Sequence, residues 1–220
     1  MPRLSREKER LVKETKKSKL ITAINAVIDI IAAGLLWLVC SLPILTLGAA
    51  STALYYAVVK CIRHERGALG KSFFSAFRRE FKISTLLWLI FLGVLLVLGA
   101  DAWAIGLMTQ GSGMFPALSR ILLLLPLMLF PWVFAFVSRF SNTVGGTLRY
   151  CAYLALRHIG LTLAMAAELA GFALIVYLMP QIAPLLPGIV CLLLSLHIEP
   201  VFKAITAEMD VQNEDDWYNE

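Results

Sequence analysis

Six apolar segments, each long enough to cross a lipid bilayer as a helix, recur along this chain of 220 residues. A crossing helix needs about 20 predominantly apolar residues, and all its backbone polar groups must pair within the structure. The sequence therefore predicts an all-α integral membrane protein with about six transmembrane helices. The predicted spans cover about residues 21–42, 43–62, 84–107, 117–138, 159–179 and 182–203.

The second of these segments has a weaker pattern than the others. It follows the first span after the short linker 41–43, and it contains a run of small residues from Gly48 to Ala53. Such a sequence also fits a re-entrant or broken helix. The distribution of charge favours a full crossing, because the basic segments would otherwise fall on both sides of the membrane.

The composition excludes a sizeable soluble domain. Hydrophobic residues make up 59% of the chain and charged residues 16%, whereas soluble domains are about half apolar and a quarter charged. Six spans leave room only for a basic tail, residues 1–19, around the transmembrane domain, residues 20–203, and for an acidic tail, residues 204–220. Neither a metal-binding spacing nor a nucleophile motif occurs. We therefore expect no enzymatic activity, no metal and no cofactor.

Basic residues predict the orientation of the spans. Of the 20 Lys and Arg residues, 19 lie in the N-terminal tail, in 60–82, in 139–158 or at Lys203, and the intervening connections carry no charge. Because Lys and Arg are retained on the cytoplasmic side, both termini are predicted to be cytoplasmic. The basic tail lacks interleaved aromatic residues, so we expect it to contact the lipid bilayer and no nucleic acid.

Two of the predicted cytoplasmic loops contain short amphipathic segments. Aromatic residues recur at helical spacing beside basic residues in the loop before the third span, and the loop before the fifth span is similar. Such segments form interfacial helices that anchor the spans in the headgroup region. Short cytoplasmic helices also dock the ATPase in ATP-driven permeases, which is the second interpretation. The residues concerned are Phe74, Phe77, Arg78, Arg79, Phe81, Tyr150, Tyr153 and Arg157.

Two acidic residues are predicted to lie deep in the bilayer. Asp29 lies nine residues after Leu20 and Glu168 nine residues after Ile159, which corresponds to a depth of about 13 Å. Charged side chains at such depth face bundle interiors or form proton and substrate sites. Asn25, one helical turn before Asp29, is placed to hydrogen-bond its carboxyl group. Two interpretations stay open: a polar clamp between spans one and five, and a site for a proton or a substrate.

A further pair of charges lies near the predicted outer ends of two spans. Asp101 is near the end of the third span and Arg120 near the start of the fourth, and the connection between these spans is short and uncharged. The two side chains can therefore lie at similar depth and form an ion pair. The alternative is that each extends separately to the outer headgroups.

Small residues spaced four apart predict close helix contacts. Gly48 and Thr52 have this spacing in the second span, and Ala167 and Gly171 have it in the fifth. Small side chains at this spacing let two membrane helices approach closely. The alternative explanation is the generally high Ala and Gly content of membrane helices.

Residues 35–56 read LLWLVCSLPILTLGAASTALYY, and Phe73 and Phe74 follow ahead of the third span. This segment resembles the YesL family of bacterial membrane proteins, which has an LLWLxCSLPIxTxGASTxALYY stretch before a short FF-containing helix. The resemblance covers about residues 29–90. It departs from the family pattern at Gly34, where Asn is usual, and at Ala49-Ala50, which is one residue longer.

The resemblance implies a location in the bacterial plasma membrane. The family has no established activity, but its genes tend to lie beside sugar-binding ABC importers and two-component sensors in Gram-positive bacteria. This association implies an accessory or permease-like component linked to carbohydrate (oligosaccharide) uptake, with ABC transporter subunits as partners. The alternatives are a membrane partner of a sensor kinase and a self-contained small-solute carrier.

Overall fold

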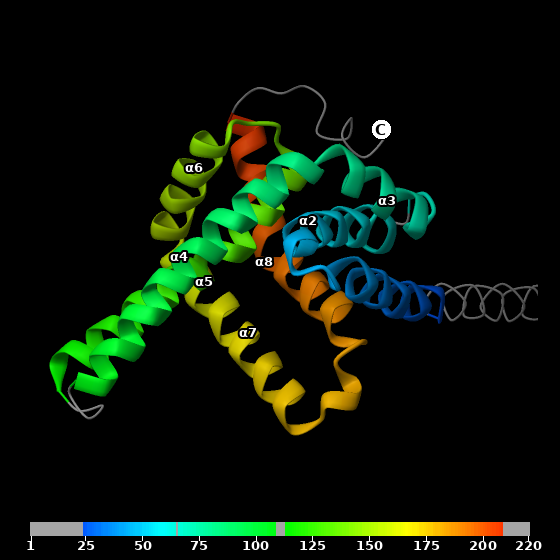
Figure 1. The fold of residues 1–220 in the computed structure, drawn as a ribbon. Helices are drawn as coiled ribbons and strands as arrows, with labels where there is room; N and C mark the ends of the chain where they lie inside the picture. Colours follow the sequence, from blue (N-terminus) through cyan, green and yellow to red (C-terminus); the bar gives the residue numbers. More distant parts are fainter. Residues whose placement is uncertain (1–23, 65, 109–112, 209–220) are drawn as a thin grey trace, which may run out of the picture.

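The computed structural model describes residues 24–64, 66–108 and 113–208. These residues form helices joined by short turns, with no strand among them (Figure 1). Six helical segments are long and apolar enough to cross a membrane, which confirms the predicted helical membrane fold. The N-terminal tail and all but the start of the C-terminal tail lie outside the described residues. The six segments are Ile24–Ser41, Ile44–Arg63, Phe81–Met108, Met114–Arg139, Ile159–Leu178 and Leu186–Thr206.

The long helices are arranged as three consecutive hairpins, and a short helix separates each hairpin from the next (Figure 1). The first hairpin pairs the Ile24–Ser41 helix with a continuous segment made of η1, α2 and η2. The short helix α3 precedes the α4–α5 hairpin, and α6 precedes the α7–α8 hairpin. The bounds are η1 (Ile44–Thr46), α2 (Leu47–Ala57), η2 (Val58–Arg63), α3 (Leu69–Arg79), α4 (Phe81–Met108), α5 (Met114–Arg139), α6 (Val144–Arg157), α7 (Ile159–Leu178), η3 (Pro180–Ile182) and α8 (Leu186–Glu208).

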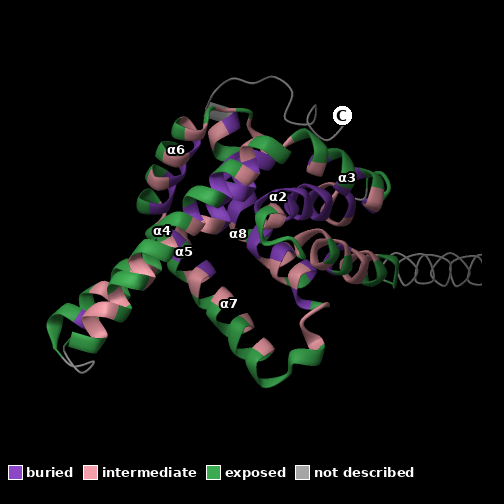
Figure 2. Ribbon diagram, viewed as in Figure 1, coloured by how far each residue is buried: buried purple, intermediate pink, exposed green. Residues whose placement is uncertain are grey.

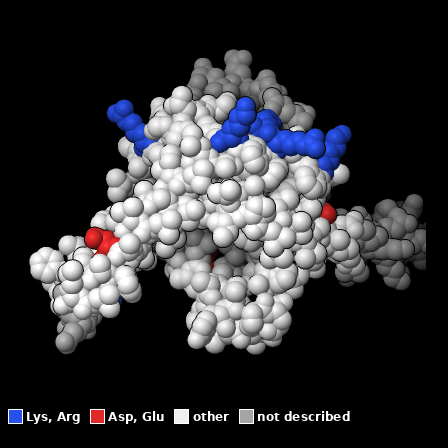
Figure 3. Space-filling view, viewed as in Figure 1, with Lys and Arg blue, Asp and Glu red and all other residues white. Residues whose placement is uncertain are grey.

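Most of the Lys and Arg side chains that Figure 3 shows gather at one end of the molecule. We call this the basic end; it carries α3, α6 and the described parts of segments 60–82 and 139–158. Both short helices therefore lie at the same end of the molecule, and their location at the membrane interface stays a prediction. Away from the basic end, the α4–α5 hairpin diverges from α7 (Figure 1), and its side chains are largely exposed (Figure 2). Trp103 and Leu107, for example, are 70% and 64% exposed, as expected of a surface covered by lipid.

The helix α2 is the most enclosed element of the fold. All of its residues except Leu47 and Ser51 are buried, and Figure 2 shows it surrounded by the other helices. A Cβ atom at Gly48 would collide with the Ser84 carbonyl of α4, so this glycine sets how closely the two helices approach. The Thr52 and Ser84 hydroxyls form a hydrogen bond of 2.9 Å one turn further along. The predicted close contact at Gly48 and Thr52 is thus confirmed.

The corresponding prediction for the fifth span is wrong. A Cβ atom added at Gly171 would meet no atom within 4 Å, so this face of α7 points away from the other helices. Instead, the close contacts of the last hairpin are made by Gly188 in α8, which packs against the Ile30 carbonyl of the first helix. Gly34 of the first helix packs in turn against the Pro184 carbonyl. The spacing alone does not tell a packed stripe of small residues from one that faces lipid.

Candidate functional site

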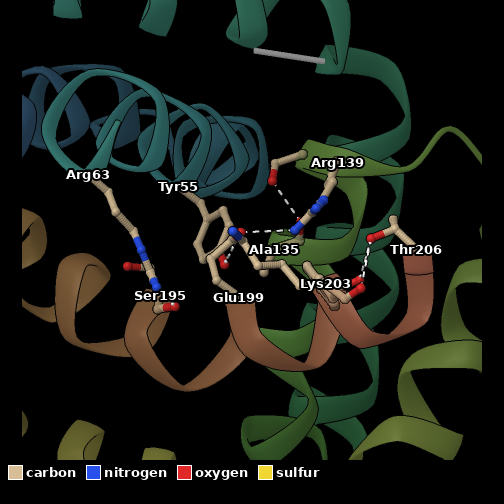
Figure 4. A network of polar contacts seen from close by, with 10 residues as sticks. Tyr55, Arg63, Ala135, Arg139, Ser195, Glu199, Lys203 and Thr206 are labelled. Carbon is tan, nitrogen blue, oxygen red and sulfur yellow. Dashed lines mark hydrogen bonds and ion pairs between the residues drawn. The ribbon is translucent and has the colours of Figure 1, made fainter. Parts of the chain in front are cut away.

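An ion pair lies in the interior of the molecule near the basic end. Nη1 of Arg139, the last residue of α5, is 2.9 Å from Oε2 of Glu199 in α8 (Figure 4). The two side chains are 1% and 0% exposed. The aromatic rings of Phe140 and Phe202 lie 5.8 Å from the Arg139 guanidinium carbon and shield the pair further. Because a charge buried without its partner is strongly unfavourable, the two residues depend on each other.

The second carboxylate oxygen of Glu199 is also bound. The Tyr55 hydroxyl of α2 donates a hydrogen bond of 3.0 Å to Oε1 (Figure 4). The Glu199 carboxylate therefore receives one donor from each of the other two hairpins. Bonds to a charged acceptor are stronger than bonds between neutral groups, so this Arg139–Glu199–Tyr55 network fixes the relative position of all three hairpins.

A second bond joins the first and third hairpins beside this network. Arg63 Nη1 donates to the backbone carbonyl of Ser195 at 2.6 Å (Figure 4). Arg63 ends the η2 segment, where the chain leaves the α-helical pattern for the wider turn of a π-helix. Pro200 follows Glu199 in the partner helix and offers no N–H to the carbonyl four residues earlier. Irregular turns of these two kinds often lie at functional sites of membrane helices.

The structure places the predicted deep acids apart from this network. Glu168 lies opposite His197 of α8, with 3.6 Å between Oε1 and Nδ1, and its other oxygen is buried without a hydrogen-bond partner. Asp29 is half-buried and Asn25 is exposed, and no hydrogen bond joins these two residues. Glu168 thus lies beside a titratable group on α8, whereas Asp29 and Asn25 are not joined to each other.

Asp101 and Arg120 are not brought together. Both side chains are exposed near the far end of the α4–α5 hairpin, and no ion pair between them is found in the described part of the chain. This arrangement corresponds to the alternative expectation, in which each charge extends separately to the headgroups.

The short helix α3 has two faces. Its buried face contains Leu69, Ser72, Phe73 and Ala76, and Phe73 rather than one of the predicted aromatic residues is fully buried. Phe74 is 48% exposed and stays available to a lipid or a partner. The helix ends at Arg79, so Phe81 belongs to α4, although its ring still contacts that of Phe77 at 5.4 Å.

The other short helix, α6, borders a cavity of about 500 Å³ at the basic end. Phe136, Tyr150, Tyr153, Arg157 and His158 contribute to its wall. Tyr150 and Tyr153 are half-exposed, and the Arg157 guanidinium donates to the Tyr153 hydroxyl at 2.8 Å. This cavity combines aromatic surface with hydrogen-bonding groups, as sites for protein side chains and headgroups do.

A second cavity of about 400 Å³ lies among the long helices. Its wall comes from the first helix, α2, α5, α7 and α8, and nearly all of the side chains are aliphatic or aromatic. No group of three or more His, Cys, Asp or Glu side chains within the described residues could hold a metal ion.

Residues 30–102 match a described family. The description of that family is "Protein of unknown function, DUF624". No curated protein and no solved structure matches the chain. The DUF624 segment contains Tyr55 and the Gly48 contact, but it ends before Arg139 and Glu199. The family match therefore covers one member of the buried network.

Four residues of this region were not predicted from the sequence: Glu199, Arg139, Tyr55 and His197. Glu199 lies inside the last predicted span and directly precedes Pro200, which is a signal for a buried functional acid in a membrane helix. Arg139 directly follows the fourth predicted span, a position that indicates a basic loop rather than the membrane interior. Nothing in the sequence distinguishes Tyr55 from the neighbouring Tyr56.

Proposed function

We propose that the chain is an accessory membrane component linked to bacterial carbohydrate uptake, with the basic end and both termini in the cytoplasm of the cell. We favour an accessory role over that of a sugar carrier because the cavity among the long helices has an apolar wall. A sugar needs several hydrogen-bonding partners, and burying its hydroxyl groups without them is costly. The polar atoms of the wall residues Trp37 and Tyr55 already bond to Ser51 and Glu199.

The basic end supports the partner side of this proposal. The α6 cavity and the exposed Tyr153 and Arg157 offer a site for side chains of a cytoplasmic protein. A positively charged face also attracts acidic partners and anionic lipid. The link to carbohydrate comes from the YesL-like segment at residues 35–56, and we propose ABC transporter subunits as the partners.

Copurification from native membranes tests this proposal. The tagged chain is isolated after mild crosslinking, and the captured proteins are identified by mass spectrometry. We expect a sugar-transporter permease or its ATPase, with capture reduced by Arg157→Ala and Tyr153→Ala. Leu156→Ala is the matched control, because Leu156 is 75% exposed on the same helix but does not line the α6 cavity.

Other results would replace the accessory role. Capture of a sensor kinase in place of transporter subunits would favour the alternative of a kinase partner. Uptake of a labelled oligosaccharide by liposomes that contain only the purified chain would establish a self-contained carrier instead. An unchanged yield from the Arg157→Ala variant would exclude α6 as the docking helix.

A further inference from the structure

The apolar cavity among the long helices follows the direction of α8. The wall residues of this helix run from Leu186 to Ile198, which corresponds to about 18 Å at the rise of an α-helix. The wall residues of α7, Leu169, Phe172, Ala173 and Val176, lie on one face at helical spacing. The cavity is therefore elongated along two membrane-crossing helices.

The length of this cavity matches that of a lipid chain. The hydrocarbon core of a bilayer is about 30 Å thick, so the chains of one leaflet extend over about 15 Å. On α8 the wall ends at Ile198, directly before Glu199 of the buried network. A chain that enters from the end farther from the basic end would thus stop at the ring of Tyr55.

The chemistry of the wall excludes most other ligands. Among the side chains that line it, Trp37 donates to Ser51 at 3.2 Å and Tyr55 donates to Glu199 at 3.0 Å. A polar ligand would lose its hydrogen bonds to water, and the Trp37 and Tyr55 donors, which are already engaged, would not replace them. A hydrocarbon chain has no hydrogen bonds to water to lose, and it provides packing contacts for the side chains of the wall.

The position of the wall also gives the ligand access. Figure 3 shows the surface hollowed at the last hairpin, between α7 and α8. Ala173, in the wall, is exposed, and so is its neighbour Leu174 on the adjoining face. The wall therefore adjoins the lipid-covered surface of α7.

We propose that this cavity binds one acyl chain of a membrane phospholipid. The bound chain packs between α5, α7 and α8. It separates these helices on the side of the Arg139–Glu199–Tyr55 network that is farther from the basic end. This site is separate from α6 and does not rest on the proposed role in carbohydrate uptake.

Photolabelling in a reconstituted bilayer tests the site. The full-length protein is placed in liposomes with phosphatidylglycerol that carries a diazirine in the middle of one acyl chain, and the labelled residues are mapped after illumination. We expect labelling of wall residues such as Val190 to be several-fold higher than that of Ile189, which is exposed on the next face of α8. Equal labelling of wall and outer residues would show only annular lipid and overturn the proposal.

Two pairs of variants sharpen this test. Ala173→Trp fills the cavity from α7, and Leu174→Trp places the same side chain on the outer surface. We expect the first to remove the excess labelling of the α8 wall and the second to preserve it. Val190→Trp, with Ile189→Trp as its control, provides an independent pair on α8. Circular dichroism establishes the fold of each variant, and excess labelling that persists in a folded, filled variant contradicts a chain in this cavity.

Discussion

Arg139 and Glu199 contact each other at 2.9 Å in the interior of the bundle, although 60 residues of sequence separate them. Neither side chain reaches solvent, and Tyr55 binds the carboxylate oxygen that Arg139 leaves free. Three hairpins are thus connected through one carboxylate.

Removing one charge of the buried pair should strongly destabilise the protein. We expect Glu199→Gln or Arg139→Met to lower the free energy of unfolding by about 3–5 kcal/mol, because each leaves a buried charge without its partner. In the double variant Arg139→Met with Glu199→Leu, the free energy of unfolding should decrease by less than the sum of the decreases in the two single variants. Thermal unfolding in detergent measures these values, and additive losses would contradict the coupling.

Tyr55→Phe should lower the free energy of unfolding by about 1.5–3 kcal/mol, as expected for the loss of a hydrogen bond to a charged group.

Gly48 should tolerate no side chain, whereas Gly171 should. Gly48→Ala forces α2 away from the Ser84 carbonyl of α4, and overpacking of this kind costs about 1–3 kcal/mol. Gly171→Ala meets open space and should leave the unfolding midpoint unchanged or slightly raised, because Ala favours the helix. Equal midpoints for the two variants would exclude the close contact.

The stability of the folded chain should depend on pH through His64, which directly follows the second span. Burial lowers the pKa of this imidazole, although the Glu199 carboxylate acts in the opposite direction. On unfolding, His64 regains its ordinary pKa of about 6.5 and binds a proton that the folded state resists. Its contribution is therefore present above about pH 6.5 and decreases as the pH falls below that value. We expect His64→Gln to reduce the loss of stability between neutral and mildly acidic pH. Identical profiles of unfolding midpoint against pH for the variant and the parent protein would contradict this role of His64.

Cysteine labelling in intact cells should establish the orientation. Met114 is 73% exposed at the end of the α4–α5 hairpin, away from the basic end. Met114→Cys should react with a membrane-impermeant maleimide in intact cells, whereas Ser75→Cys on α3 should react only after permeabilisation. Ser75 is exposed on α3 and therefore accessible to the reagent once the membrane is permeabilised. The reverse pattern would place the basic end outside the cell.

A native cysteine supplies an internal control for this labelling. Cys151 of α6 is fully buried, and burial raises the pKa of its thiol to about 12. Because the thiolate is the reactive form, Cys151 should stay unmodified in the folded protein near neutral pH.

The spans were predictable because their length and apolar composition are local properties. The fifth span was predicted at 159–179 and is observed at Ile159–Leu178. The last helix begins at Leu186 rather than at 182, because Pro180–Ile182 forms a separate short turn. The buried network was not predictable in the same way. Arg139 looks like an ordinary residue at a span end. Glu199 lies inside a predicted span, which marks it as a buried acid, but only the packing of the hairpins shows that Arg139 is its partner.

The sequence also placed charges at the correct ends of helices without giving their partners. Asp101 and Arg120 were predicted either to form an ion pair or to extend separately, and among the described residues each is exposed with no ion pair between them. Glu168 was predicted to lie deep in the bilayer, and the structure places its carboxyl group 3.6 Å from Nδ1 of His197 on the neighbouring helix, a neighbour that the sequence did not indicate. Depth along a helix follows from counting residues, but the direction of a side chain around the bundle depends on the helix packing.

The long sequence separation of Arg139 and Glu199 has a consequence for synthesis of the chain. Ribosomes add about 5–20 residues per second, so the last hairpin emerges seconds after Arg139 has reached the membrane. During this interval, Glu199 has not yet been synthesised. The bonds through which its carboxylate connects Tyr55 of the first hairpin with Arg139 of the second are therefore absent. The arrival of α8 therefore completes assembly, and a nascent chain arrested before residue 199 holds Arg139 without the carboxylate of Glu199.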